Sequence, residues 1–334
     1  MQPSLYSGLV LEIKKFVLRF VPSKSKIFEQ GMKWFIPWSI IGKGLSFWSM
    51  LITRKARLIF EESKTSPSYL DYNMIDIYQK QYPPLSPYGY DPRSLEKRGE
   101  ERAKSMLRLI PSKKSQTFLE LGCWDGMVSC VLQRLGKTTV AIDVHSEGFD
   151  KRSTREGVLL IKMDAHHLQF EDETFDVVFS YNAFEHFTNP EMVLREAIRV
   201  VRTGGYIYLK FGNTALSPFS AHLPREITIP YCDALFSKDS LQKFANSKGL
   251  GILDFNAHNS YTLEDFKKLF VRYSGWLKRV RYLEVPVLNN SRIKLIEKNP
   301  SCFKSKTRNF DNLLVSSVDV LFQKTKLDMT CKLN

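Results

Sequence analysis

A glycine-bracketed turn near two acidic residues is the part of the chain best suited to hold a ligand. Residues 118–143 predict an apolar strand, a short turn, a helix and a second strand that ends at Asp143. Gly122 and Gly126 bracket the turn and would let the backbone approach a ligand that a Cβ would keep away. Glu120 precedes the turn, and a carboxylate in the position of Asp143 can accept hydrogen bonds from ribose hydroxyls. The pattern indicates a site for a nucleoside-containing cofactor.

The strands that follow predict further residues at the same edge. A strand over residues 157–163 is followed by Asp164, and an uninterrupted apolar strand over 175–180 ends in Ser180. Ligands of open parallel sheets bind outside the carboxyl ends of the strands. We therefore expect the residues after these strands to join Asp143 in one site.

Strands and helices alternate from residue 117 onward. This alternation predicts an α/β fold with a doubly wound, mainly parallel, seven-stranded sheet of Rossmann-like type. A basic, Asn-rich segment over 289–308 is expected to be a surface loop. The later strands are expected over 206–211, 277–285 and 314–322, and the helices over 93–109, 127–135, 190–201, 238–247 and 262–273.

Composition predicts an N-terminal extension followed by one larger domain. Residues 1–92 are basic and rich in aromatic residues, and helical spacing is clear from Leu5 to Phe20. They end in a proline-rich linker that cannot continue a helix. Residues 93–325 form the expected ligand-binding domain, with a polar insertion at about 213–260. Residues 326–334 are a tail.

The charge of the chain favours an anionic partner. Its formal net charge is +14, and residues 1–60 hold ten basic and two acidic residues, a difference of +8. Residues 34–52 are nearly long enough to span a bilayer, but Lys43 at their centre would cost about 2.5–3.5 kcal/mol, so we reject a spanning helix. Two interpretations of the extension stay open. One is a segment on an anionic membrane surface, and the other is a helical cap over the larger domain.

The five cysteines have no regular spacing and no C-x-x-C pair. Such a set predicts reduced thiols, and neither a metal site nor a disulfide framework. The chain also lacks a secretory signal pattern at its start. We therefore expect a cytoplasmic protein, either free or peripheral at the membrane.

An ordered set of motifs resembles the class I S-adenosylmethionine-dependent methyltransferases, in particular their small-molecule branch. The resemblance is strongest over residues 107–211 and looser up to residue 322. Each motif alone is weak, whereas five in this order and spacing carry the prediction of fold and cofactor. The motifs are Glu120–Gly126, Asp143, Met163–Ala165, Phe175–Ser180 with Glu185–Phe187, and Arg202–Gly205.

The resemblance implies S-adenosyl-L-methionine as cofactor and assigns its contacts. The glycine turn would pass under the amino-acid part, Asp143 would hold the ribose, and Asp164 would cap the adenine amino group. The family usually has a glycine in the position of Trp124, so the turn or the methionine end is expected to differ here. The residues predicted to contact the cofactor are Glu120, Gly122, Cys123, Trp124, Asp125, Gly126, Asp143, Asp164, Ala165, Ser180, Tyr181 and Asn182.

Other nucleotide sites fit the sequence less well. A nicotinamide dinucleotide fingerprint needs Gly-x-Gly-x-x-Gly after the first strand, and here only two glycines four residues apart follow Glu120. In a dinucleotide site the negatively charged carboxylate of Glu120 would lie near the pyrophosphate, which is also negative. A P-loop is excluded because the one Gly-Lys-Thr, at residues 136–138, lacks the first glycine of Gly-x-x-x-x-Gly-Lys-Thr: residue 131 is a valine.

Methyl transfer from a sulfonium needs mainly positioning, and a general base only where the acceptor must lose a proton. The candidate bases are His186, after the fourth strand, and His222, in the insertion. Either histidine can equally be an ordinary structural or surface residue. We expect O-methylation of a small molecule, a glycan or a lipid-linked precursor. An RNA methyltransferase and a non-catalytic methyltransferase-like binding protein are the alternatives, although no RNA-binding motif is present. The sequence does not indicate which oligomeric state the protein has.

Overall fold

The computed structural model describes residues 38–82, 89–212, 215–218, 223–224, 226–256 and 258–326. All the elements below belong to the compact unit that begins at Trp38. The expected helix over Leu5–Phe20 and most of the proline-rich linker lie outside the described residues.

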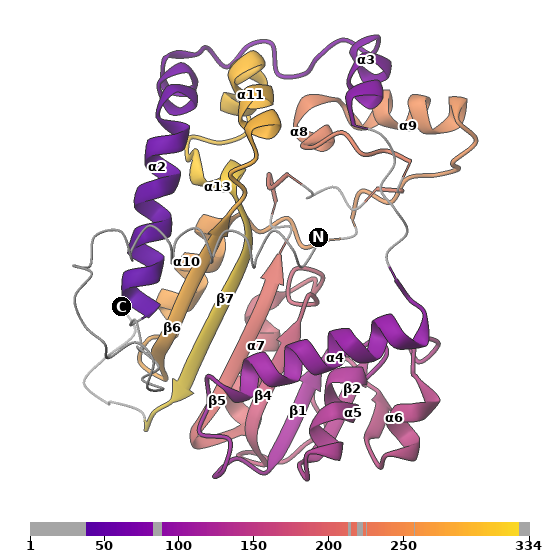
Figure 1. Cartoon of the computed structure of the whole chain (residues 1–334), viewed down its shortest axis with the longest axis vertical. Helices are drawn as coiled ribbons and strands as arrows, with labels where there is room; N and C mark the ends of the chain where they lie inside the picture. The colour runs from indigo at the N-terminus through magenta and orange to yellow at the C-terminus, as the bar shows by residue number, and fades with distance from the viewer. Residues whose placement is uncertain are drawn as a thin grey trace, which may run out of the picture. The chain divides into compact units, whose positions relative to one another are not determined.

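A seven-stranded mixed sheet forms the centre of this unit, in the order β3-β2-β1-β4-β5-β7-β6 (Figure 1). Strands β1 to β5 are parallel to one another, whereas β7 is antiparallel to both β5 and β6. The predicted seven-stranded, mainly parallel sheet is confirmed. The strands are β1 (Thr117–Leu121), β2 (Thr138–Asp143), β3 (Leu159–Lys162), β4 (Phe175–Tyr181), β5 (Val201–Gly212), β6 (Leu277–Pro286) and β7 (Val315–Lys324).

Helices cover both faces of the sheet because successive residues of a strand point to opposite sides. In β1, Phe118 packs in a cluster with α4 and α5, and the next residue, Leu119, packs in a cluster with α7 and α10. Figure 1 shows α4 crossing one face of the sheet and α7 behind it. The helices are α2 (Trp38–Glu62), α3 (Met74–Gln81), α4 (Pro92–Leu107), α5 (Met127–Arg134), α6 (Lys151–Arg155), α7 (Pro190–Val200), α8 (Cys232–Leu235), α9 (Lys238–Ser247), α10 (Leu263–Arg272), α11 (Asn290–Lys298), α12 (Pro300–Lys304) and α13 (Asp311–Leu314).

Local signals fix where the helices on the sheet begin. The carboxylate of Asp91 accepts a hydrogen bond from the Ser94 N–H at 3.1 Å, and Pro92 opens α4. Asn189 caps α7 in the same way. In α10, Thr262 and Asp265 form a reciprocal capping box. These caps set the start of α4, α7 and α10, three of the helices that lie against the sheet.

The strand order reverses between β1 and β4, because β2 lies on one side of β1 and β4 on the other. Such a switch point is where open α/β sheets form ligand crevices. Every residue of β4 is buried, as expected for a central strand covered on both faces. The fold therefore brings the ends of β1, β2 and β4 to one edge.

The expected surface loop over residues 289–308 is wrong in part. Residues 290–298 and 300–304 form α11 and α12, with Asn289 capping α11 and Pro300 opening α12. Ile293, Ile296 and Phe303 are buried in a hydrophobic cluster. The basic and Asn-rich composition hid this apolar spacing, because most of the polar residues lie on the outer side of the two helices.

A second hydrophobic cluster joins segment 38–82 to the insertion and to helices α11 to α13. Phe60 of α2 meets Phe310 edge to face, with ring centroids 5.3 Å apart. The Leu70 N–H donates to the Leu235 carbonyl at 2.8 Å. Segment 38–82 and the insertion are thus packed together, while the domain boundary near residue 92 stays a prediction.

Within the part of the chain that the structure describes, no helix combines the length and the apolar character needed to cross a membrane.

Candidate functional site

The turn between β1 and α5 is tightly built. Gly122, Trp124 and Gly126 all have a positive φ, of 67°, 50° and 68°. A Cβ on Gly122 would clash with the Cβ of Ala183, and one on Gly126 would come 2.7 Å from Leu160. Both glycines are therefore required by backbone conformation and by close protein packing. A ligand is not needed to explain them.

Asp143 holds this turn from the end of β2. Its Oδ2 accepts a hydrogen bond from the Trp124 N–H at 2.8 Å, and its Oδ1 accepts one from the His145 N–H at 3.0 Å. A carboxylate has about four acceptor positions, so two remain. The residue is only half-buried. Asp143 can therefore support the turn and still accept hydrogen bonds from a ligand.

Glu120 has a different environment from Asp143. It is 2% exposed, and its Oε2 accepts hydrogen bonds from the Ser129 hydroxyl at 2.7 Å and the Ser129 N–H at 3.2 Å. Burial raises the pKa of this carboxyl group to about 8. Glu120 thus fastens α5 to β1 from beneath the turn, where it positions the backbone.

The remaining turn residues are also engaged with the protein. The Asp125 Oδ1 accepts from the Met127 N–H at 2.8 Å at the start of α5, and burial raises the pKa of its carboxyl group. Cys123 is buried, which raises the pKa of its thiol and makes it a poor nucleophile. These two side chains shape the turn.

Trp124 is the exposed side chain of the turn. It is 49% exposed, and a Cβ on Gly148 would come 2.8 Å from its ring atoms Cδ2 and Cε2. The indole therefore lies on the loop after β2. A tryptophan in left-handed conformation is uncommon, and here the backbone N–H contacts Asp143 while the half-exposed indole packs on Gly148.

After β3, Asp164 is exposed and Ala165 is buried. The Asp164 Oδ1 accepts from the His166 N–H at 2.9 Å and contacts the His166 Nδ1 at 2.6 Å. The Nε2 of the same imidazole accepts from the Asn189 N–H at 3.1 Å. The imidazole of His166 thus links Asp164 to the start of α7.

The residues at the end of β4 point in different directions. The Ser180 hydroxyl is buried and donates to the Leu121 carbonyl at 2.9 Å. The Tyr181 hydroxyl donates to the Arg102 carbonyl at 2.7 Å. Asn182 is exposed with a φ of 51°, and its N–H donates to the Lys210 carbonyl at 2.8 Å. Of these three residues, Asn182 is the one whose side chain is open to a ligand.

The structure describes only one of the two candidate bases. His186 follows β4 and is exposed. His222 lies outside the described residues. Their assignment as bases therefore stays a prediction.

Glu185 is a candidate that the sequence reasoning missed. It is 2% exposed, and its Oε1 accepts from the Gly212 N–H at 3.3 Å. Its Oε2 is buried and has no hydrogen-bond partner among the described residues. Burial raises the pKa of this carboxyl group to about 7. Hydrogen bonds from backbone N–H groups and the charge of Arg102 lower the pKa, but they offset the effect of burial only in part. The available signal was an acid between Phe184 and Phe187, directly after a buried strand.

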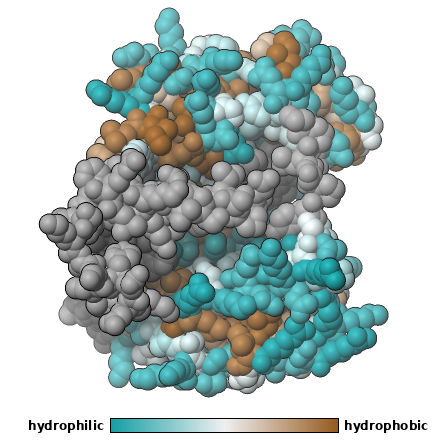
Figure 2. Space-filling model, viewed as in Figure 1, coloured by the Kyte–Doolittle hydropathy of each residue, from teal (hydrophilic) through white to brown (hydrophobic). Residues whose placement is uncertain are grey.

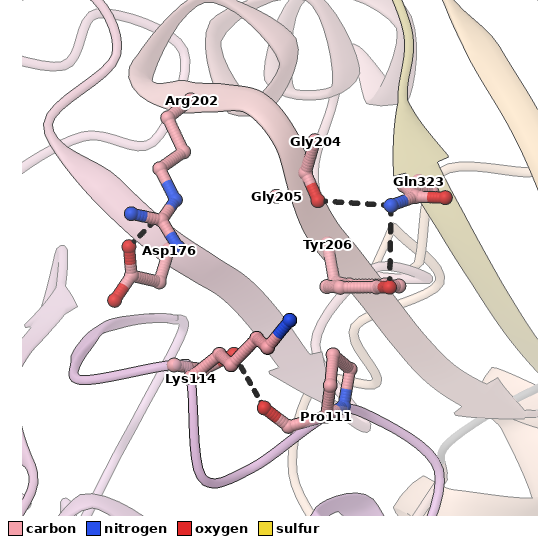
Figure 3. Close-up of a pocket in the computed structure, with 9 residues that line it drawn as sticks. Pro111, Lys114, Asp176, Arg202, Gly204, Gly205, Tyr206 and Gln323 are labelled. Carbon is pink, nitrogen blue, oxygen red and sulfur yellow. Dashed lines mark hydrogen bonds and ion pairs between the residues drawn. The ribbon is translucent and has the colours of Figure 1, made fainter.

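A hollow of about 360 Å³ lies at the opposite end of these strands. Figure 3 shows Arg202 turned toward Asp176, with 2.8 Å between Nε and Oδ1, and Gln323 donating to the Gly204 carbonyl at 3.0 Å. None of the predicted site residues lines this hollow. Among the described residues, no group of three or more His, Cys, Asp or Glu side chains could hold a metal ion.

Comparison with known proteins agrees with this geometry. Residues 119–209 match the family model of a methyltransferase domain. The match runs from β1 to β5 and includes every predicted cofactor contact. The chain contains a class I S-adenosylmethionine-dependent methyltransferase domain. S-adenosyl-L-methionine is the methyl donor of this family.

The names of relatives of this domain describe methylation of oxygen in one case and of nitrogen in another. A ubiquinone biosynthesis O-methyltransferase of Rhizobium etli is 29% identical over 151 residues, which cover 41% of this chain and 60% of that protein. A norajmaline N-methyltransferase of Rauvolfia serpentina is 31% identical over 138 residues, 37% of this chain and 47% of that protein. The chain thus spans less than two thirds of the length of these relatives.

One solved structure similar to this chain is the PH0226 protein of Pyrococcus horikoshii. It is 17% identical, covers 71% of this chain and 95% of its own, and has a TM-score of 0.43.

The buried carboxyl group of Glu120 makes a prediction about stability. Its pKa is raised from 4.5 to about 8 in the folded protein. Folding is therefore favoured by this group below pH 4.5, and the contribution is lost as pH rises through 8. Each pKa unit corresponds to about 1.4 kcal/mol. We expect Glu120→Gln, which keeps an acceptor for Ser129, to raise the free energy of unfolding at pH 8 and to leave it nearly unchanged at pH 4.

Urea unfolding at both pH values measures this effect, with the exposed Glu101→Gln as matched control. An equal effect of Glu120→Gln at the two pH values would contradict the assignment of Glu120 as a buried positioning residue.

Proposed function

We propose that the chain is an S-adenosylmethionine-dependent methyltransferase that O-methylates a small molecule, a glycan or a lipid-linked precursor. The observation that carries this proposal is the carboxylate of Asp143, which supports the glycine turn and keeps acceptor capacity at the switch point of the sheet. The names of the relatives include both O- and N-methyltransferases. The oxygen acceptor is our choice because of the carboxyl group of Glu185.

The residues at this edge fit the cofactor in part. Asp143 is suited to the ribose hydroxyls, and the exposed carboxylate of Asp164 is suited to an exocyclic amino group. Trp124 would lie against the ligand as an aromatic wall. Glu120, Cys123 and Asp125 would act through the backbone that they hold, because their side chains are turned into the protein.

Ser180 and Tyr181 would contribute backbone and shape to the same edge. Their hydroxyl groups already donate to main-chain carbonyls at the ends of β1 and α4. Asn182 would supply a polar side chain there. The predicted contacts thus divide into groups that face the ligand and groups that position the turn.

When bound, S-adenosyl-L-methionine supplies an electrophilic methyl group on a sulfonium. A hydroxyl acceptor forms a new oxygen–carbon bond as the sulfur–carbon bond breaks, and the hydroxyl proton must pass to a base. We propose Glu185 for this base. Its buried Oε2 has no hydrogen-bond partner among the described residues, and a hydroxyl proton is the partner that it lacks.

The environment of Glu185 suits this role. The Gly212 N–H at the end of β5 holds its Oε1, so that the carboxyl group joins the ends of β4 and β5. A pKa of about 7 lets it accept a proton near neutral pH. The Asn259 N–H donates to the Glu185 carbonyl at 2.8 Å, which ties the residue to the far end of the insertion. His186 and His222 stay the alternative bases.

The cofactor proposal predicts tight binding of S-adenosylhomocysteine that depends on Asp143. We expect Asp143→Asn to weaken binding at least about tenfold, equivalent to about 1.4 kcal/mol, because an amide accepts fewer hydrogen bonds from the ribose. Isothermal titration of the full chain measures this. Asp172→Asn is the matched control, since its side chain is 75% exposed and pairs with Arg199.

No binding by folded wild-type protein would overturn the enzyme and leave the non-catalytic alternative. Equal binding by wild type and Asp143→Asn would overturn only the ribose contact.

The proposal for Glu185 predicts the pH dependence of catalysis. As a base it works when ionised, so kcat/KM should rise with pH up to about 7 and then level off. We expect Glu185→Gln to lower kcat by about 10²–10⁴-fold and to abolish this rise. The assay follows methyl transfer to a panel of phenolic, carbohydrate and lipid-linked hydroxyl acceptors, and the profile is taken with the acceptor that is methylated.

His186→Gln is the matched control. If that variant loses the rise with pH and Glu185→Gln keeps it, His186 is the base. Binding of S-adenosylhomocysteine by Glu185→Gln shows that the variant is folded.

A further inference from the structure

We propose that helix α2 docks the protein on an anionic lipid surface through one exposed face. Five large apolar side chains on α2 are 48–56% exposed. At 100° per residue, four of them lie within one stripe along the helix. Figure 2 shows apolar side chains gathered over the upper part of α2. The exposed apolar residues are Phe47, Met50, Leu51, Ile52 and Leu58.

This stripe is not the core face of α2. The helix already has a core face on its other side, where Thr53, Ala56 and Phe60 are at most 1% exposed. Phe60 packs in the second hydrophobic cluster, and α2 lies along β6, α11 and α12. Surface helices of globular proteins have one apolar stripe and a polar opposite side. α2 has two apolar stripes, and the second needs a cover of its own.

The charges beside the exposed stripe are positive. Arg54 lies within it and Lys55 lies next to it, and the Lys55 side chain is 78% exposed with its Nζ 3.9 Å from Glu297. The acids of α2 come only at its end, as Glu61 and Glu62. The Glu61 carboxylate is held by Lys304 at 2.6 Å. Between Phe47 and Leu58, α2 thus carries basic residues and no acid.

The edge of the sheet next to α2 also exposes basic residues. β6 is an edge strand that lies beside α2, and its residues Lys278, Arg279 and Val280 are exposed. Edge strands commonly carry charges that oppose further strand pairing. On β6 these charges are basic, and they add to the positive field next to α2.

A lipid surface explains this combination best. Interfacial helices place their apolar side chains about 5–10 Å into the headgroup boundary, and their basic residues contact anionic lipids. A helix of 25 residues is about 38 Å long and can lie in that plane. Such a helix needs no spanning segment. The inference is independent of the cofactor and base proposed above.

Co-sedimentation of the full chain with vesicles tests the proposal. We expect binding to phosphatidylglycerol-containing vesicles and little binding to pure phosphatidylcholine, with release at about 1 M salt, where the Debye length is about 3 Å. Leu51→Ser with Leu58→Ser should weaken binding about tenfold. Arg54→Glu with Lys55→Glu should weaken it more than tenfold.

The matched controls are Ile252→Ser with Val271→Ser, which are 93% and 66% exposed elsewhere in the chain, and Lys113→Glu with Lys114→Glu. Thermal unfolding and S-adenosylhomocysteine binding report whether each variant is folded. Because all variants keep residues 1–37, a loss of binding belongs to α2. Binding unchanged by both α2 variants overturns the proposal. The proposal is also overturned if light scattering shows that the wild type is a dimer and that the Leu51→Ser with Leu58→Ser variant is a monomer. A second copy of the chain would then cover the stripe.

Discussion

The hydrogen bond from the Trp124 N–H to the Asp143 carboxylate is the contact on which the candidate site depends. It joins the turn after β1 to the end of β2, and these two strands are neighbours in the sheet. Beneath it, the buried carboxyl group of Glu120 fastens α5 to β1 through Ser129. One acid therefore stays at the surface with spare acceptors, and the other is enclosed. That division decides which groups can meet a ligand.

The sequence was sufficient for the sheet because the central strands are continuous apolar runs bounded by turn residues. Residues 175–180 illustrate this, since β4 is buried throughout and ends within one residue of its expected position. The sequence was insufficient for residues 289–308, where basic and amide side chains masked the apolar spacing of two short helices. Average composition describes a segment poorly when only a few residues make contact with the core.

Site residues were predictable in position but not in orientation. Strand ends placed Asp143, Asp164 and Asn182 at one edge of the sheet. Whether Ser180 faces a ligand or the Leu121 carbonyl depends on the neighbouring strand, which the sequence does not reveal. Glu185 was named only as part of a family motif and not as a site residue, because its burial and its oxygen without a partner arise from tertiary packing.

The central claim is that the turn, the end of β2 and the end of β3 form one cofactor site. Hydrogen exchange of the full chain with and without S-adenosylhomocysteine tests it most directly, because each backbone N–H is read separately. The account predicts slower exchange at residues 122–126, 144–146 and 165–166 on addition of the ligand. Unchanged exchange at these residues, with protection instead around the hollow at Gly204 and Gly205, would contradict it.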